Sequence, residues 1–238
     1  MDNLLEDDIK NSILHLQSIF PKNKLGKSLV TYEKTINFKT IADCLIFTEK
    51  QGIIGIEIKT AHDTLKRLSH QLDDYVKCCS YVYVYCHDSH LEKVLQLLKE
   101  KHFNYVGVIS YTEFNHTAIA GIVRKANKSP ALISEGSTSL LWTSELKQIL
   151  SKVEHDKVLG NRYQLDNKFK SYFSRYQGNQ LVSLLYVNNL TDSKKPLQRF
   201  YFGKTYVHDR TIDHENGKTL ARRYRNLTHR NRRYHAKR

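Results

Sequence analysis

Residues 41–59, IADCLIFTEKQGIIGIEIK, decide the fold that the sequence predicts. Apolar and β-branched residues fill both ends of this stretch, and the run TEKQG at residues 48–52 separates them. Such a composition is typical of two short antiparallel strands joined by a hairpin loop of about five residues. Three charged residues, Asp43, Glu57 and Lys59, interrupt the otherwise apolar hairpin and mark it as the candidate functional element.

Side-chain alternation places the charged residues of the second strand together. Glu57 and Lys59 share one face, while the isoleucines between and before them occupy the other face, which a helix can cover. Pairing of the two strands can bring Asp43 beside Glu57. Two carboxylates held close repel each other unless a cation lies between them, and oxygen ligands suit Mg²⁺ or Mn²⁺. The hairpin therefore predicts a hydrolytic metal site.

The next segment reads as an amphipathic helix. In residues 63–79, DTLKRLSHQLDDYVKCC, apolar side chains recur at steps of three and four, and Asp63 is a suitable N-cap. Gln71 and Tyr75 stand four residues apart, so they share a helix face. Residues 81–86, YVYVYC, have the alternation of a further strand.

Together these residues resemble a known enzyme family. Asp43, thirteen intervening residues, Glu57-Ile58-Lys59 and then the helix with Gln71 and Tyr75 resemble the RecB-like branch of the PD-(D/E)XK nuclease superfamily, including its small bacterial and phage members. Ala42 stands where the motif has proline. The resemblance covers roughly residues 1–112 and implies an α/β, restriction-endonuclease-like α-β-β-β-α-β core with a mixed central sheet.

The resemblance also implies a metal site. Asp43, Glu57 and the backbone carbonyl of Ile58 would hold Mg²⁺ or Mn²⁺, and Glu6 on the first helix is a further candidate ligand. Glu6 has a plainer explanation, because acidic residues near a helix start interact favourably with the helix dipole.

Catalytic roles follow for the remaining motif residues. Lys59 would orient or deprotonate the attacking water, and Gln71 and Tyr75 would position the scissile strand or support the metal ligands. The expected activity is that of a Mg²⁺- or Mn²⁺-dependent deoxyribonuclease. Structural alternatives stay open: Asp43 as a turn cap, an exposed Glu57–Lys59 pair, and surface polar residues on the helix. The alternative function is a noncatalytic nucleic-acid-binding or inhibitory protein on a nuclease-like fold.

The rest of the predicted nuclease-like domain, residues 1–126, has a regular pattern up to residue 111. Helices are expected at residues 3–20 and 90–101, with strands at 28–38 and 104–111. Glu33 in the first strand is a second auxiliary carboxylate candidate. From residue 112 to 130 the pattern weakens, and KANKSP at 125–130 has the composition of a linker or exposed loop.

Residues 127–193 predict a helical extension. Helices are expected at 138–153, 167–176 and 180–188, and Trp142, the chain's single tryptophan, is expected to pack against the core or neighbouring helices.

Residues 194–238 predict a basic nucleic-acid-binding tail. They carry fourteen lysines and arginines against three acidic residues, a net charge of +11 out of the chain's +14. Such charge neutralises phosphates, and arginine and tyrosine can stack on exposed bases. A disordered tail that only aids solubility is the alternative. The candidate nucleic-acid contacts are Arg222, Arg223, Arg225, Arg230, Arg232 and Arg233.

Composition sets the remaining expectations. The apolar fraction of 40% supports a buried core, and four cysteines without zinc-binding spacing predict reduced packing thiols. No run of eighteen apolar residues exists, and the acidic start MDNLLEDDIK lacks a signal peptide's features, so we expect a cytoplasmic protein away from membranes. DNA rather than RNA is the expected partner, and cutting both strands of a duplex would favour a homodimer.

Overall fold

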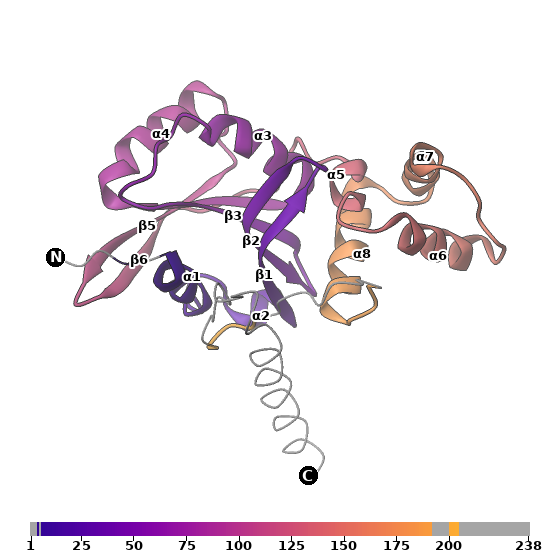
Figure 1. Cartoon of the computed structure of the whole chain (residues 1–238), viewed down its shortest axis with the longest axis horizontal. Coiled ribbons are helices and arrows are strands. Elements are labelled where there is room, and N and C mark those ends of the chain that lie inside the picture. Colours follow the sequence, from indigo (N-terminus) through magenta and orange to yellow (C-terminus); the bar gives the residue numbers. More distant parts are fainter. Residues whose placement is uncertain (1–3, 5, 192–199, 205–238) are drawn as a thin grey trace, which may run out of the picture. The chain divides into compact units, whose positions relative to one another are not determined.

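The sheet of this α/β protein contains six strands in sequence order. The computed structural model describes residue 4, residues 6–191 and residues 200–204. The first three strands pair antiparallel, the next two pairings are parallel, and the last is antiparallel, so the sheet is mixed (Figure 1). The strands are β1 (Ser28–Ile36), β2 (Thr40–Thr48), β3 (Gly52–Lys59), β4 (Tyr81–His87), β5 (Gly107–Phe114) and β6 (Thr117–Arg124).

Helices cover both faces of the sheet, with α3 and α4 on one face and α1 on the other (Figure 1). The core on the α3 face includes Leu45, Phe47 and Leu72, and the core on the α1 face includes Ile46 and Ile13. The helices are α1 (Glu6–Leu14), α2 (Lys22–Leu25), α3 (Leu68–Cys78), α4 (Leu91–Glu100), α5 (Ser134–Thr138), α6 (Thr143–Glu154), α7 (Arg162–Tyr172) and α8 (Arg175–Val187).

This order confirms the predicted fold class. The sequence α1, β1, β2, β3, α3, β4 reproduces the α-β-β-β-α-β core, and helices follow it along the chain. The hairpin turn lies at residues 48–52, as expected, and all four cysteines are free and buried. The structure adds β6, which the weak pattern of residues 112–130 did not reveal. As the last strand of the sheet, β6 alternates half-buried with exposed side chains.

Several predicted boundaries were wrong for local reasons. Helix α3 begins at Leu68, so Asp63 is not its N-cap. Asp63 Oδ2 instead accepts hydrogen bonds from the amide and hydroxyl of Thr60, both at 2.7 Å. Such short local bonds compete with helix formation. The first helix likewise ends at Leu14 rather than at residue 20.

The helical extension also differs from its predicted outline. The stretch 167–176 contains a helix break, because Ser174 caps a new helix by accepting a hydrogen bond from the Gln177 amide. Trp142 does not pack into a core: 59% of it is exposed, at the start of α6.

A buried asparagine on α8 joins the helices to the sheet. Asn179 is fully buried, and its Oδ1 accepts the Ile53 amide at 2.9 Å and the Ser80 hydroxyl at 2.7 Å. Its Nδ2 donates to the Cys78 carbonyl and to Ser137 Oγ, both at 2.8 Å. The side chain thereby ties α8 to α5 and to the starts of two strands.

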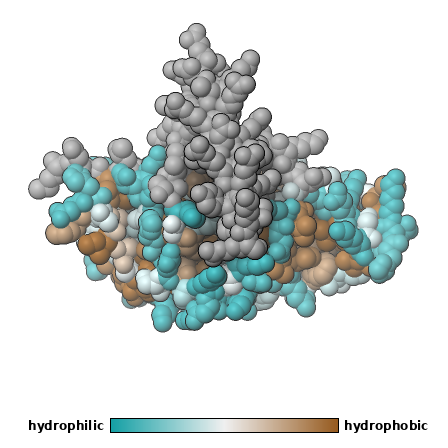
Figure 2. Space-filling model, turned by 90° about the horizontal axis from the view of Figure 1, so that it is seen from below, coloured by the Kyte–Doolittle hydropathy of each residue, from teal (hydrophilic) through white to brown (hydrophobic). Residues whose placement is uncertain are grey.

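The chain divides into two compact units, Met1–Tyr206 and Val207–Arg238, and every described residue belongs to the first. Hydrophobic patches alternate with hydrophilic residues on the face shown in Figure 2. In the part of the chain that the structure describes, no helix is long and apolar enough to cross a bilayer.

Candidate active site

Strand β2 separates from β3 at Asp43. The paired register ends at Cys44 opposite Ile56, and one more step would place Asp43 opposite Glu57. At this point Asp43 Oδ2 accepts the Ile58 amide hydrogen bond at 2.8 Å. A carboxylate oxygen therefore serves as acceptor for an amide of β3, and this bond fixes the carboxylate at the end of the hairpin.

A kink in β1 accompanies this separation. Glu33 has a φ of 53°, and the pairing of β1 with β2 omits Glu33 and Asp43, which lie opposite each other in the register. A positive φ is uncommon for a residue with a Cβ atom. The Asp43 amide donates to the Tyr75 hydroxyl at 2.8 Å, so helix α3 supplies its partner. The Glu33 carboxylate pairs with the Lys10 ammonium at 2.6 Å, and its role as an auxiliary metal ligand stays a prediction.

Glu57 and Lys59 share a face of β3, as the alternation predicted, but they are buried rather than exposed. Glu57 is 0% exposed and Lys59 is 6% exposed. The Lys59 ammonium donates to Glu57 Oε1 at 2.6 Å and to Gln71 Oε1 at 3.2 Å. The second carboxylate oxygen of Glu57, Oε2, is buried and has no hydrogen-bond partner among the described residues.

Tyr75 is fully buried against β3, which excludes a role as a helix-surface residue. Its hydroxyl also donates to the Ile56 carbonyl at 3.3 Å. Gly55 makes this contact possible, because a Cβ atom there would lie 2.5 Å from Tyr75 Cδ1. A glycine inside an apolar strand is a sequence signal of such close approach.

The environment of Asp43 favours a proton. Burial, followed by the charge of Glu57, raises the pKa of Asp43 from 3.8 to about 7. The Ile58 amide and the Lys59 charge act in the opposite direction and lower that pKa. Near neutral pH the Asp43 carboxyl is therefore partly protonated, and a bound cation would displace this proton.

The residues present fit a divalent cation. Two neighbouring carboxyl groups, one with an unpartnered buried oxygen and one with a raised pKa, would both gain from a cation between them. The described residues contain no cluster of three or more His, Cys, Asp or Glu that could hold a metal. The predicted third ligand is the Ile58 carbonyl, and the Glu6 side chain lies outside the described atoms.

The structure thus brings together all five predicted catalytic residues, Asp43, Glu57, Lys59, Gln71 and Tyr75. The six candidate arginines of the tail, residues 222–233, lie outside the described residues.

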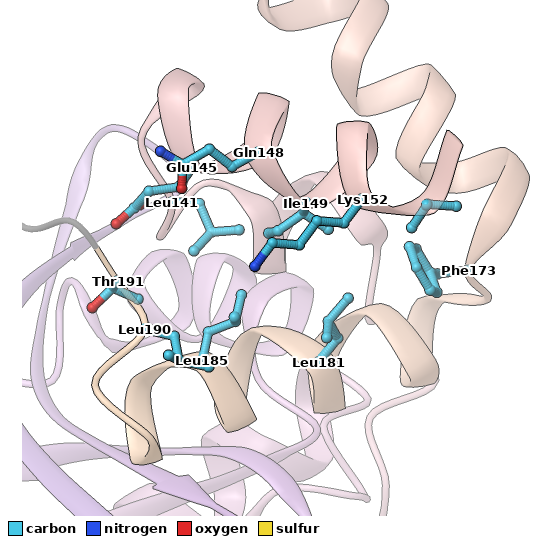
Figure 3. Close-up of a pocket in the computed structure, with 11 residues that line it drawn as sticks. Leu141, Glu145, Gln148, Ile149, Lys152, Phe173, Leu181, Leu185, Leu190 and Thr191 are labelled. Atoms are coloured by element: carbon cyan, nitrogen blue, oxygen red, sulfur yellow. The ribbon is translucent and has the colours of Figure 1, made fainter. Parts of the chain in front are cut away.

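A separate pocket of about 300 Å³ lies between α6 and α8 (Figure 3). Its wall is mostly aliphatic, and Lys152 extends across it from α6. It contains none of the predicted catalytic residues, so it is distinct from the site on β3.

Comparisons with known proteins give one family. A family model described as "Bacteriophage P4 protein cII" matches residues 1–196. No curated protein matches the chain. One similar solved structure is the SPO1766 protein of unknown function from Silicibacter pomeroyi, with 12% sequence identity and a TM-score of 0.39; the match covers 67% of this chain and 98% of that chain.

Proposed function

The chain belongs to the bacteriophage P4 protein cII family, and we propose that it is a metal-dependent nuclease that hydrolyses phosphodiester bonds in DNA. The observation that carries the proposal is the position of the Lys59 ammonium. This ammonium donates hydrogen bonds to both Glu57 and Gln71. The carboxyl group of Asp43, on the adjacent strand β2, lies close enough to Glu57 for the Glu57 charge to raise its pKa. Two carboxylates beside one ammonium suit phosphodiester hydrolysis, because the carboxylates can bind a metal while the ammonium binds the anionic substrate.

Each residue has a distinct task in this mechanism. Asp43 and Glu57 would hold Mg²⁺ or Mn²⁺, which would supply a Lewis acid that stabilises negative charge on the phosphoryl oxygens. The Lys59 ammonium, which donates to Glu57 Oε1, would orient the attacking water or donate to the phosphate oxygens. Gln71 accepts a hydrogen bond from the Lys59 ammonium and would position it, and Tyr75 accepts the Asp43 amide and fixes the main chain there.

One observation favours a second candidate, a noncatalytic nucleic-acid-binding protein. Glu57 and Lys59 form a closed, buried ion pair, and such pairs also occur as purely structural features. In that case a divalent metal would neither break the Glu57–Lys59 ion pair nor lead to cleavage of the nucleic acid. The two functions therefore differ in whether metal produces cleavage.

The test is a cleavage assay on single-stranded, duplex and branched DNA and on RNA, with Mg²⁺, Mn²⁺ or EDTA. We expect metal-dependent cleavage by the wild type, reduced about 10²- to 10³-fold or more in Lys59→Ala and Asp43→Asn. Asp43→Asn keeps an oxygen that can accept the Ile58 amide, whereas Lys59→Ala leaves the Glu57 charge unpaired, so thermal melting must confirm that both variants fold.

Lys77→Ala is the matched control, because Lys77 is exposed on the same helix as Gln71. It should cleave like the wild type. Equal turnover by folded Lys59→Ala would refute the assigned mechanism. Binding without cleavage in every metal would support the noncatalytic function instead.

A further inference from the structure

The turn between β1 and β2 carries an aromatic residue where glycine is favoured. The Lys39 amide donates to the Ile36 carbonyl at 3.1 Å, and both central residues, Asn37 and Phe38, have positive φ, 48° and 62°. Two consecutive residues in this conformation favour Asn followed by Gly. Phe38 therefore occupies a strained position, which a packing gain would normally have to offset.

The packing of Phe38 does not bury its ring. Phe38 is 67% exposed, and the centre of its ring lies 5.3 Å from the guanidinium carbon of Arg162. That guanidinium is fixed by Asp166 Oδ2 and by the Leu141 carbonyl, both at 2.9 Å. The structure thus holds a ring and a planar cation together at the surface.

Two more exposed aromatic residues are the chain neighbours of Leu141 and Arg162, which take part in this contact. Trp142, which follows Leu141, is 59% exposed, and Tyr163, which follows Arg162, is 75% exposed. Phe38, Trp142 and Tyr163 come from the hairpin turn and from the starts of α6 and α7. These three residues and Arg162 are called the aromatic surface below.

The aromatic surface is attached to the helix of the candidate active site. The Lys39 ammonium pairs with Asp74 Oδ1 at 3.1 Å, and Asn37 Nδ2 donates to the Asp74 carbonyl at 2.7 Å. Asp74 lies on α3 directly before Tyr75, whose hydroxyl accepts the Asp43 amide. Two hydrogen-bonded steps therefore connect the turn to the predicted metal ligand.

We propose that the aromatic surface binds an unpaired nucleic-acid strand by stacking its bases on the exposed rings. This inference rests on the proposed nuclease function and defines its substrate class as single-stranded. Bases in a duplex are stacked on one another, whereas unpaired bases can stack on aromatic side chains and arginine. Charge supports this occupant: residues 1–193, which include the aromatic surface, carry a net +3 and residues 194–238 carry the other +11 of the chain, and this positive charge attracts a polyanion and repels a second copy.

The single tryptophan makes the proposal directly measurable. Full-length protein is titrated in EDTA with a thymidine oligonucleotide and with a duplex of the same length, and Trp142 fluorescence is recorded. We expect quenching and tighter binding with the single strand. Phe38→Gly should weaken single-strand binding about 5- to 100-fold, the range that corresponds to one stacked base. It should not lower the melting temperature, because glycine relieves the strained turn.

Phe114→Ala is the control, because Phe114 on β5 is similarly exposed at 62%. Its binding should equal that of the wild type. The ratio of single-strand to duplex affinity separates stacking from contacts to phosphates, which both ligands share.

The proposal is overturned if Phe38→Gly binds the single strand like the wild type. Equal Trp142 quenching by the duplex would also overturn it, as would a concentration-dependent dimer, detected by sedimentation, that Phe38→Gly abolishes. A parallel cleavage assay separates this inference from the nuclease proposal. Loss of binding in Phe38→Gly without cleavage by the wild type would refute the nuclease alone, whereas cleavage with unchanged Phe38→Gly binding would refute stacking alone.

Discussion

Asp43 combines a structural and a chemical role in one carboxyl group. Its oxygen satisfies an amide of β3, while burial and the neighbouring Glu57 charge favour its protonated form. The sequence indicated this pairing through strand alternation. It could not reveal the raised pKa, which depends on how completely α3 and the strands exclude water.

Asp43 should make stability depend on pH. Its pKa is about 7 in the folded chain, against about 3.9 in an unfolded one, so the folded state binds more protons between these values. Its contribution to the free energy of unfolding therefore falls as pH rises from about 4 to 7. Urea unfolding at pH 5 and pH 8, without metal, should show this fall in the wild type but not in Asp43→Asn. Mg²⁺ should stabilise the wild type more at pH 8, because it competes with the proton.

Asp73→Asn, at an exposed position of helix α3, should retain the wild-type pH dependence. Identical pH profiles for Asp43→Asn and the wild type would show that Asp43 titrates normally.

At the scale of elements, the hairpin and helix α3 were predictable because their patterns are local. The alternation of apolar residues predicted β2 and β3, and apolar residues spaced three and four apart predicted most of α3. The kink at Glu33 and the burial of Lys59 were not predictable. Both depend on contacts between elements distant in sequence, such as Lys10 with Glu33 and Gln71 with Lys59.

Gly55 should be required for the fit between β3 and α3. In Gly55→Ala the new Cβ atom would lie 2.5 Å from Tyr75 Cδ1 and 2.9 Å from Cys79 Sγ. We expect a loss of about 1–3 kcal/mol in the free energy of unfolding, because a packed helix must shift. Cleavage should fall as well, since Tyr75 holds the Asp43 amide. Both effects can be measured by urea unfolding and by the nuclease assay.

Gly121→Ala provides the comparison. Gly121 also lies inside a strand, but apart from its chain neighbours no atom of the described residues lies within 4 Å of the position its Cβ would take. This variant should be as stable as the wild type or slightly more stable. Equal effects of the two substitutions would show that the contact between Gly55 and Tyr75 does not determine the loss of stability.

At the scale of the whole described unit, polar contacts join the helical extension to the sheet. Asn179 links α8 with β3 and α5, and the fully buried Ser183 accepts the Thr48 amide at 2.7 Å. The apolar residues of this segment predicted its helices. The burial of Asn179 and Ser183 was not predictable, because polar residues in a helix usually lie at its surface. Their burial follows from the unpaired amides at the edges of the hairpin turn, which need partners once α8 covers them.

Because of these contacts, residues 127–191 should unfold together with the sheet rather than as a separate domain. Trp142 reports on the start of α6, and far-ultraviolet circular dichroism reports on all helices and strands. We expect the two urea-unfolding curves to coincide. Asn179→Ala should shift both curves together by about 1–3 kcal/mol, because it leaves buried groups such as the Ile53 amide unpaired. Asn188→Ala, at the exposed end of the same helix, should leave them in place. An earlier Trp142 transition would instead show that the helical extension folds independently, as a boundary between residues 126 and 127 implies.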